Sequence, residues 1–490
     1  MGFSMGFQPS EKLSKEEIQS GLKLVVADGL AAESMVAFTQ GAFLVAMAIQ
    51  LGASNFQLGV LAALPTFSSI FQLVSIWLVQ RYNNRRVITL VFNFLARFPL
   101  FIIGLLPFLF SAGSSMYALI FFLFFHYYFG SVAGASWNSW MRDLVPTEKL
   151  GSYFSHRSKM MQSLNVVLSL ATAFALDHIK LHYPQYELWA YSGMFLLGGI
   201  FGMIGIFLLS RTPEPKSDLI KGNVFNLLQK PLRDSNFRKL LSFNSFWAFA
   251  LNLATPFFSV YMMKTLGISL SYIIILGIIG QISSIVSLKM WGRYSDKYSN
   301  KTIINISAPV YILCIMAWAF TSMPSSPIAV LFFLVLINIF SGISTAGINL
   351  AINNIGMKLA PKEDAFTYLS VKNMVVAFFS AIAPMLGGLM ADFFSSHQLV
   401  WSFEWKNAEG SSVFPLVDLQ GWSFFFIIGG LLAMYSLRIL SSVREQGEVH
   451  KERVVGVMRT RVRRSVKREA KGIFKRSTSS AKRVAGFFSF

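Results

Sequence analysis

The sequence contains one cysteine, Cys314, and few charged residues for its length. A single cysteine excludes an internal disulfide framework. Charged residues make up only 13% of the 490 positions, whereas 54% are hydrophobic and the mean hydropathy is +0.54. A soluble chain of this length needs more charge to cover its surface. The composition therefore indicates a membrane protein.

Motifs for catalysis, metal binding and nucleotide binding are also missing. The six histidines and one cysteine show no zinc-ligand spacing, and the sequence has no phosphate-binding loop of the P-loop pattern. We therefore expect no enzyme activity, no metal site, no cofactor and no ATP-driven pumping.

Long apolar runs fill most of the chain instead. Crossing the hydrocarbon core of a bilayer takes about 20 apolar residues, because a helix rises about 1.5 Å per residue. Twelve segments reach this length: 27–51, 56–80, 87–110, 116–140, 158–179, 188–210, 238–263, 270–290, 302–322, 327–351, 367–393 and 420–442. These runs are apolar on all sides, which favours helices over the alternating strands of a membrane barrel. The predicted fold class is an all-α membrane protein with twelve transmembrane helices.

Lysine and arginine are distributed unevenly among the loops. The loops after spans 2, 4 and 8 and the linker between spans 6 and 7 are basic, whereas 53–56, 111–115 and 322–327 carry no Lys or Arg. Under the positive-inside rule, this pattern places both termini in the cytoplasm and the chain in the inner cell membrane.

An internal repeat occurs at an offset of 215 residues. The matching positions include Leu51-Gly52 with Leu266-Gly267, Ser54 with Ser269, Pro146 with Pro361, Glu148 with Glu363 and Tyr153 with Tyr368. Six spans separate the copies, so both halves have the same orientation, as in transporters with parallel repeats. We expect a terminal segment at 1–26, pseudo-symmetric six-helix halves at 27–210 and 238–442, a linker at 211–237 and a tail at 443–490.

The loop after span 8 carries the most specific motif. Gly292, Asp296, Lys297 and Lys301 follow the pattern Gly, three residues, Asp, a basic residue, any residue, Gly, then one or two basic residues; Ser299 stands in place of the second glycine, and Asn300 precedes Lys301. On this motif, residues 20–443 resemble the major facilitator superfamily. The first-half copy is degenerate: Gln80 replaces the aspartate, and Arg81 and Arg85 follow.

The resemblance implies a latch between helices on the cytoplasmic side. In that role, Asp296 pairs with an arginine or a helix N-terminus; alternatively, it only caps a helix. The loss of the carboxylate at Gln80 implies that the first-half latch is weakened or replaced. Arg142, Asp143 and Arg157 are candidates for a second gate, or else they are interface residues that follow the positive-inside rule.

Polar residues inside the apolar spans supply the candidates for solute or ion binding, because such residues are costly in lipid and normally face a cavity. The fold that the resemblance implies has its cavity mainly between spans 1, 4, 7 and 10. The candidates are Glu33, Gln40, Arg97, His126, Asn244, Asn252, Asn338 and Asn349.

Three of these candidates have specific roles to be distinguished. Glu33, the deeper of the two carboxylates in span 1, is the expected residue for proton coupling. Arg97 either belongs to the site or pairs with a neighbour to hold helices in register. His126 either carries protons or is a hydrogen-bonded packing residue.

The predicted function is secondary active transport of a small organic solute by alternating access, driven by an ion gradient or by the solute gradient. Amides and aromatic rings suit a neutral or weakly charged solute, and protons are a candidate coupling ion. Span 5 lacks the Gly- and Pro-rich run usual in drug–proton antiporters of the family. The alternative is a transporter-like scaffold or assembly factor without transport activity.

The tail differs in composition from the rest of the chain. Residues 443–490 contain fourteen Lys and Arg and four Glu, a net charge of +10. Apolar residues recur there at spacings of three and four, which predicts a basic amphipathic helix. We expect it to contact anionic lipids rather than nucleic acid, and we expect the protein to be a monomer.

Overall fold

The computed structural model describes residues 8–11, 13–146, 149–216, 230–323, 326–361, 364–407, 410–445 and 448–449, together with Glu452, Val454, Gly456 and Thr460. Twelve helical segments in this part of the chain are long and apolar enough to cross a membrane. Most of the predicted tail helix, and residues 217–229 of the predicted linker, lie outside the described residues.

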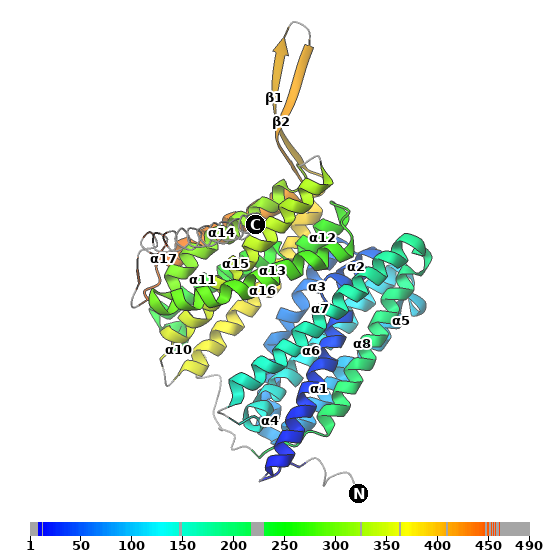
Figure 1. Ribbon diagram of the computed structural model, residues 1–490, viewed down its shortest axis with the longest axis vertical. Coiled ribbons are helices and arrows are strands. Elements are labelled where there is room, and N and C mark those ends of the chain that lie inside the picture. The colour runs from blue at the N-terminus through cyan, green and yellow to red at the C-terminus, as the bar shows by residue number, and fades with distance from the viewer. Residues whose placement is uncertain are drawn as a thin grey trace, which may run out of the picture.

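The N-terminal half contains six spans (Figure 1). In chain order they are α1 (Lys15–Thr39) with α2 (Ala42–Gln50), α3 (Asn55–Ser68) with η1 (Ser69–Phe71) and α4 (Gln72–Tyr82), α5 (Arg85–Leu109), α6 (Ala112–Leu144), α7 (Leu150–His182), and α8 (Glu187–Ser210), which η3 (Pro184–Tyr186) precedes.

The C-terminal half repeats this order after a short helix, α10 (Lys230–Arg233). Its spans are α11 (Ser235–Ala254) with α12 (Phe257–Lys264), α13 (Leu270–Lys297), α14 (Asn300–Ala317) with η4 (Trp318–Phe320), α15 (Pro327–Leu359), α16 (Ala365–Phe394) and α17 (Trp422–Ser441). The predicted architecture of twelve helices in two related six-helix halves is confirmed.

The first helix begins earlier than the apolar run suggested. Ser14 and Glu17 form a capping box that starts α1 at Lys15, so polar residues before position 27 are already helical. A helix can extend beyond the hydrocarbon core, and apolar length alone does not mark its start.

The repeat offset is visible in the backbone. The first span breaks at Gln40–Gly41 and the seventh breaks at Thr255–Pro256, 215 positions later. The turns that follow these spans place Gly52 and Gly267 at φ +81° and +62°, a left-handed conformation that glycine adopts without steric cost. The matched sequence positions therefore make the same turns.

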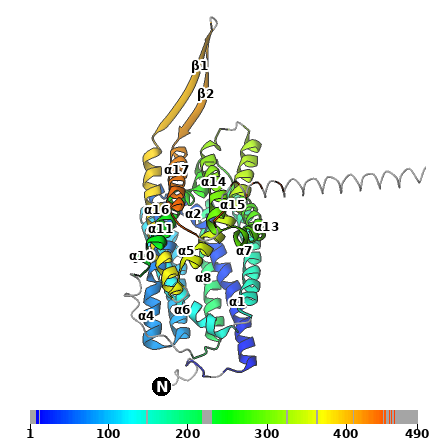
Figure 2. The same cartoon turned by 90° about the vertical axis from the view of Figure 1, so that its left-hand side faces the viewer.

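An antiparallel hairpin joins the last two spans. It consists of β1 (Gln398–Asn407) and β2 (Gly410–Gln420), with Gln398 opposite Gln420 and a register shift between Trp401 and Ser402. The hairpin rises from the end of the helices opposite the N-terminus (Figures 1 and 2). We call this end the hairpin side. The other end, where the α4–α5 turn and the start of α11 lie, is the linker side.

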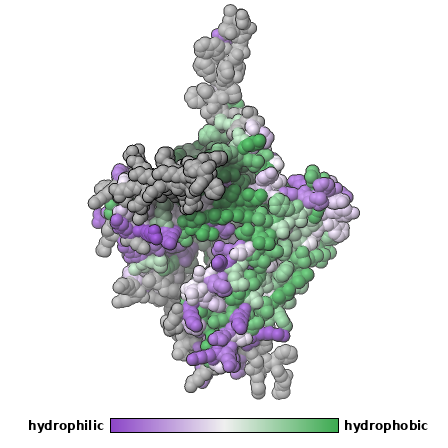
Figure 3. Space-filling view, viewed as in Figure 1, coloured by the Kyte–Doolittle hydropathy of each residue, from purple (hydrophilic) through white to green (hydrophobic). Residues whose placement is uncertain are grey.

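Packing between the halves follows two helix pairs. Helix α3 packs extensively against α16, and α7 packs against α13. Apolar residues cover much of the face shown in Figure 3, and polar residues gather toward the helix ends, as expected for a protein whose middle faces lipid. This arrangement places each candidate site either inside one half or at the contact between the two.

Candidate functional site

A cavity of about 350 Å³ lies within the C-terminal half, among α11–α15 and η4. Its wall includes Thr255, at the break between α11 and α12, and Gly280 and Gly342, where α13 and α15 approach closely. A side chain at Gly342 would overlap the Gly280 carbonyl oxygen. The break and this close helix contact shape a pocket of the size that small organic ligands occupy.

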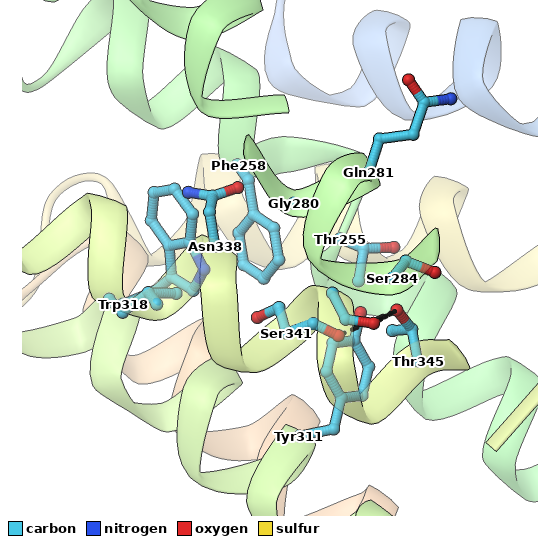
Figure 4. Close-up of a pocket in the computed structure, with 12 residues that line it drawn as sticks. Thr255, Phe258, Gly280, Gln281, Ser284, Tyr311, Trp318, Asn338, Ser341 and Thr345 are labelled. Carbon is cyan, nitrogen blue, oxygen red and sulfur yellow. Dashed lines mark hydrogen bonds between the residues drawn. The ribbon is translucent and has the colours of Figure 1, made fainter. Parts of the chain in front are cut away.

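Amide and hydroxyl groups supply the polar part of this wall. They belong to Thr255, Gln281, Ser284, Asn338, Ser341 and Thr345. The Asn338 amide nitrogen donates to the Leu334 carbonyl at 2.9 Å, and the Thr345 hydroxyl donates to the Ser341 carbonyl at 2.8 Å. These side chains retain further hydrogen-bonding capacity for a ligand. In Figure 4 the Gln281 side chain extends toward the blue ribbon of the N-terminal half.

Aromatic rings supply the apolar part. Phe258 and Trp318 stack with ring centroids 4.4 Å apart and planes at 9°, and Tyr311 also lines the cavity. No Asp, Glu, Lys or Arg is among the described residues that line it. The cavity thus combines uncharged hydrogen-bonding groups with ring faces, a lining that suits a neutral polar solute.

A buried charge cluster occupies the N-terminal half. Asp28 of α1 lies 3.8 Å from an Arg97 guanidinium nitrogen and 3.9 Å from one of Arg157; Arg97 is buried and Arg157 is partly buried. Arg97 also donates to the Gly202 carbonyl, and Arg157 donates to the Val25 carbonyl at 3.2 Å. The cluster joins α1, α5, α7 and α8, so both arginines hold helices of one half together in this structure.

Glu33 and His126 each have one defined partner in the N-terminal half. The Asn165 amide donates to the Glu33 carboxylate at 2.8 Å, and Glu33 is only partly buried. His126 is buried, and its Nδ1 lies 2.8 Å from the Ala96 carbonyl oxygen. The His126 contact is the one expected of a packing residue.

The remaining candidates are scattered, and only Asn338 lines the cavity. Asn252, one turn before Thr255, donates to the Ala248 carbonyl and to Ser380, and Asn349 is exposed. Asn244 is buried with no hydrogen-bond partner for either amide atom among the described residues. Gln40 caps the end of α1 at the helix break.

The linker side of the N-terminal half contains a buried ionic network. Arg85, whose side chain is 1% exposed, pairs with Glu214 at 3.1 Å and with Asp143. The Glu214 carboxylate also accepts the backbone N–H groups of Arg85 and Arg86, at 2.9 and 3.0 Å. Glu214 therefore neutralises Arg85 and caps α5.

The C-terminal half repeats this arrangement around Glu445. Its carboxylate accepts the N–H groups of Asn300 and Lys301, which lie 215 positions after Arg85 and Arg86. Lys358 pairs with the same carboxylate at 3.1 Å. Burial raises the pKa of Glu445, but these hydrogen bonds together outweigh burial and bring its pKa below the ordinary value.

Other predicted gate residues lie around these networks. Lys301 donates to the carbonyls of Ser441 and Val443. Arg81 and Arg142 are exposed, Gly292 is partly buried, and Lys297 lies over the Tyr298 ring at 5.3 Å. The side chain of Asp296 lies outside the described residues. Arg157 belongs to the Asp28 cluster, away from Asp143.

Several residues at these sites were not among the predicted ones. Gln281, Ser284, Ser341 and Thr345 come from spans 8 and 10, and a systematic search for polar residues in every span would have found Gln281. Glu214 and Glu445 follow the last span of each half, so only the tertiary contacts identify them as partners of the loop motif.

Twelve helices in two related halves, with a polar cavity inside one half and ionic networks at the helix ends, define a membrane transporter fold. The chain belongs to the Major Facilitator Superfamily, whose family model matches residues 29–384. No curated protein matches the sequence significantly.

Solved structures of transporters share this fold. The nucleoside transporter NupG is 12% identical with a TM-score of 0.60, over 87% of this chain and 98% of its own. A D-xylose-proton symporter is 14% identical with a TM-score of 0.59, over 88% and 100%. A bacterial homologue of the human lysosomal transporter Spinster, inward-facing and occupied, is 14% identical with a TM-score of 0.59, over 90% and 100%. At these identities the likeness concerns the fold.

Proposed function

We propose that this protein is a secondary transporter that carries a neutral, polar organic solute by alternating access. The observation that carries the proposal is the uncharged cavity in the C-terminal half, where amides and hydroxyls lie beside stacked rings. A charged solute would need a fixed counter-charge in such a wall, because burying an unpaired ion is costly. Sugars, polyols and nucleosides meet the requirement, and two of the similar structures are named for a nucleoside and for D-xylose.

The driving force is the second part of the proposal. Glu33 is a partly buried carboxylate in the first span, with a single polar contact to Asn165. Protonation would remove its charge and change that contact, so Glu33 is the proposed proton-coupling residue. Asp28 is held between two arginines, which favours a structural role for that carboxylate.

Transport also requires a defined orientation. The basic loops lie on the linker side, which the positive-inside rule assigns to the cytoplasm, with both termini. Glu214 and Glu445 lie on this side, each joining the last span of its half to the start of the third. They support rigid halves that move against each other, which is the motion proposed for the cycle.

A binding and transport assay tests the proposal. Purified protein is melted with sugars, polyols, nucleosides, amino acids and organic anions, and compounds that raise the melting temperature are tested for counterflow in proteoliposomes. A ligand that binds the folded state at 100 times its Kd stabilises that state by about 2.7 kcal/mol. Counterflow of a neutral solute is expected. Counterflow of organic anions alone would contradict the substrate class, and failure of every class would favour the scaffold alternative.

Matched variants locate the site. Asn338→Ala and Gln281→Ala each remove a polar group from the cavity wall, and we expect them to weaken binding about five- to thirtyfold if each hydrogen bond contributes roughly 1–2 kcal/mol. Asn349→Ala removes an exposed amide from the same helix as Asn338 and is the control. Equal loss in all three variants would show that the solute binds elsewhere.

A further inference from the structure

Two carboxylates join the halves on the hairpin side. Asp392, near the end of α16, accepts the backbone N–H groups of Asn55 and Phe56 at 3.2 and 3.0 Å. Asp177, near the end of α7, accepts those of Leu270 and Ser271 at 3.1 and 2.9 Å, and also the Ser271 hydroxyl. Each carboxylate belongs to one half, and each pair of N–H groups belongs to the other.

The two contacts are equivalent under the internal repeat. Asp177 and Asp392 are 215 residues apart, as are Asn55 and Leu270, and Phe56 and Ser271. The same interaction is thus made twice, in opposite directions across the contact between the halves.

Each carboxylate caps the N-terminus of a helix in the other half, where N–H groups have no partner from the half to which that helix belongs. The first N–H groups of a helix have no partner within it, and the N-terminus carries a partial positive charge. In α3, Ser54 and Gln57 form a capping box, which leaves the N–H groups of Asn55 and Phe56 for Asp392. In α13, Ser269 makes no side-chain cap, so Asp177 supplies the capping side chain.

Close backbone packing accompanies one of these contacts. A side chain at Gly59 would overlap the Pro384 carbonyl oxygen, and one at Gly388 would overlap that of Asn55. The hairpin side is therefore closed by direct contact between α3 and α16. The linker-side networks of Glu214 and Glu445, in contrast, each stay within one half.

We infer that Asp177 and Asp392 are a reciprocal pair of clasps that hold the hairpin side closed and must both release when that side opens to solute. The inference rests on the proposed transport function for its role in the cycle, but the closure itself is measurable without transport. Asp177 accepts three hydrogen bonds at buried residues, whereas Asp392 is exposed and accepts two. Lys264, which interacts with Asp392, also donates across the Asp392 contact to Ala53 and Asn55, so the Asp177 contact depends more on its carboxylate alone.

The test is a distance measurement between the halves by electron paramagnetic resonance. Spin labels at Ser114→Cys and Ser326→Cys report the hairpin side, and a second pair at Ser152→Cys and Met357→Cys reports the linker side, all in a Cys314→Ala background. All four labelled positions are exposed. The variants are Asp177→Asn, Asp392→Asn and the double substitution, which remove the charge but keep the side-chain shape.

We expect each substitution to lower the ratio of closed to open hairpin side about three- to tenfold, with the larger effect at Asp177 and a roughly multiplicative effect in the double variant. The linker-side distance should shorten in the same samples. Unchanged distances in the double variant would overturn the inference. Lengthening of both distances would also overturn it, because the halves would then be separating rather than switching.

Asp234→Asn is the matched control. Asp234 caps α11 through the N–H groups of Asn236 and Phe237, but all three residues belong to one half. Its substitution should move neither distance, because the amide oxygen can accept the same two N–H groups and no contact between the halves is changed. If the aspartate variants change the distances as expected but the protein transports no solute, only the proposed function is rejected. If the protein transports solute but the aspartate variants leave both distances unchanged, only the clasps are rejected.

Discussion

Glu445 shows how one side chain can connect three helices of one half at the linker side. It lies just after α17, caps α14 and pairs with Lys358 of α15, so its negative charge has several partners. Because these bonds favour the carboxylate over the carboxylic acid, its pKa is lower in the folded protein than in the unfolded chain. The stabilisation is present above the unfolded pKa and is lost as the pH falls through the folded pKa.

We predict that Glu445→Gln lowers the melting temperature at pH 7 by about 1–2 °C, as expected for a loss of roughly 1–2 kcal/mol in a chain of 490 residues. The gap between variant and wild type should begin to narrow as the pH falls below about 4.5, because the unfolded wild-type chain then takes up a proton at Glu445, and it should close only when the pH passes below the lower pKa of the folded protein. Melting curves between about pH 3 and pH 8 measure this gap. A gap that is constant with pH would contradict the assignment of the effect to charge.

Some residues of these sites could be identified from the sequence, and others could not. Asn338 was identified because an amide in an apolar span is conspicuous, and it lines the cavity. Arg85 was identified in the loop motif, but its partner Glu214 was not, because 129 residues separate them. A sequence shows which groups need partners, whereas the fold decides which groups meet.

Turns between spans depend on backbone conformations that few residues adopt. Gly52 has φ +81°, and a Cβ there would meet no atom within 4 Å, so any cost of substitution comes from the backbone. Gly113 also has open space, but it is helical and has no positive φ. Because a Cβ causes no steric overlap at either glycine, the difference between the two substitutions measures the cost of the backbone conformation.

We predict that Gly52→Ala lowers the melting temperature by a few degrees, since a left-handed conformation costs a residue with a Cβ about 1–2 kcal/mol. Gly113→Ala should leave it unchanged or raise it slightly, because alanine favours helix over glycine by roughly 1 kcal/mol. Thermal melting of the two single variants provides the comparison. Equal destabilisation by both would show that the turn conformation is not what Gly52 provides.

At the scale of elements, the twelve spans could be predicted because a membrane imposes a minimum apolar length. The β1–β2 hairpin could not be found by that criterion, since its strands have ten and eleven residues. The start of α1 was also missed, because a capping box rather than hydropathy sets it. Length criteria therefore find what crosses the bilayer and overlook what extends beyond it.

The charges of the loops predict the orientation of the whole molecule in the membrane. Ser152 lies on the linker side among basic loops, and Ser326 lies on the hairpin side; both are exposed. In a Cys314→Ala background, we predict that a membrane-impermeant maleimide added to intact cells labels Ser326→Cys but not Ser152→Cys. Both should be labelled after the membrane is disrupted. The reverse pattern in intact cells would invert the proposed topology.

The two-half architecture was predictable at this scale because the repeat preserves polar and turn residues in one register. Which side is closed was not, since closure depends on contacts between the halves. The sequence presents Asp177 and Asp392 as isolated carboxylates near the ends of apolar runs. Only the packing of α7 on α13 and of α3 on α16 brings them to helix N-termini.

The reciprocity of the clasps has a consequence for the ancestry of the chain. Each half carries both a carboxylate and the helix start that receives the carboxylate of the other half. Such a surface is self-complementary, which is the property of an isologous interface between two identical subunits. A separate six-helix ancestor could therefore have formed both clasps as a two-fold symmetric homodimer, before duplication and fusion joined the copies into one chain.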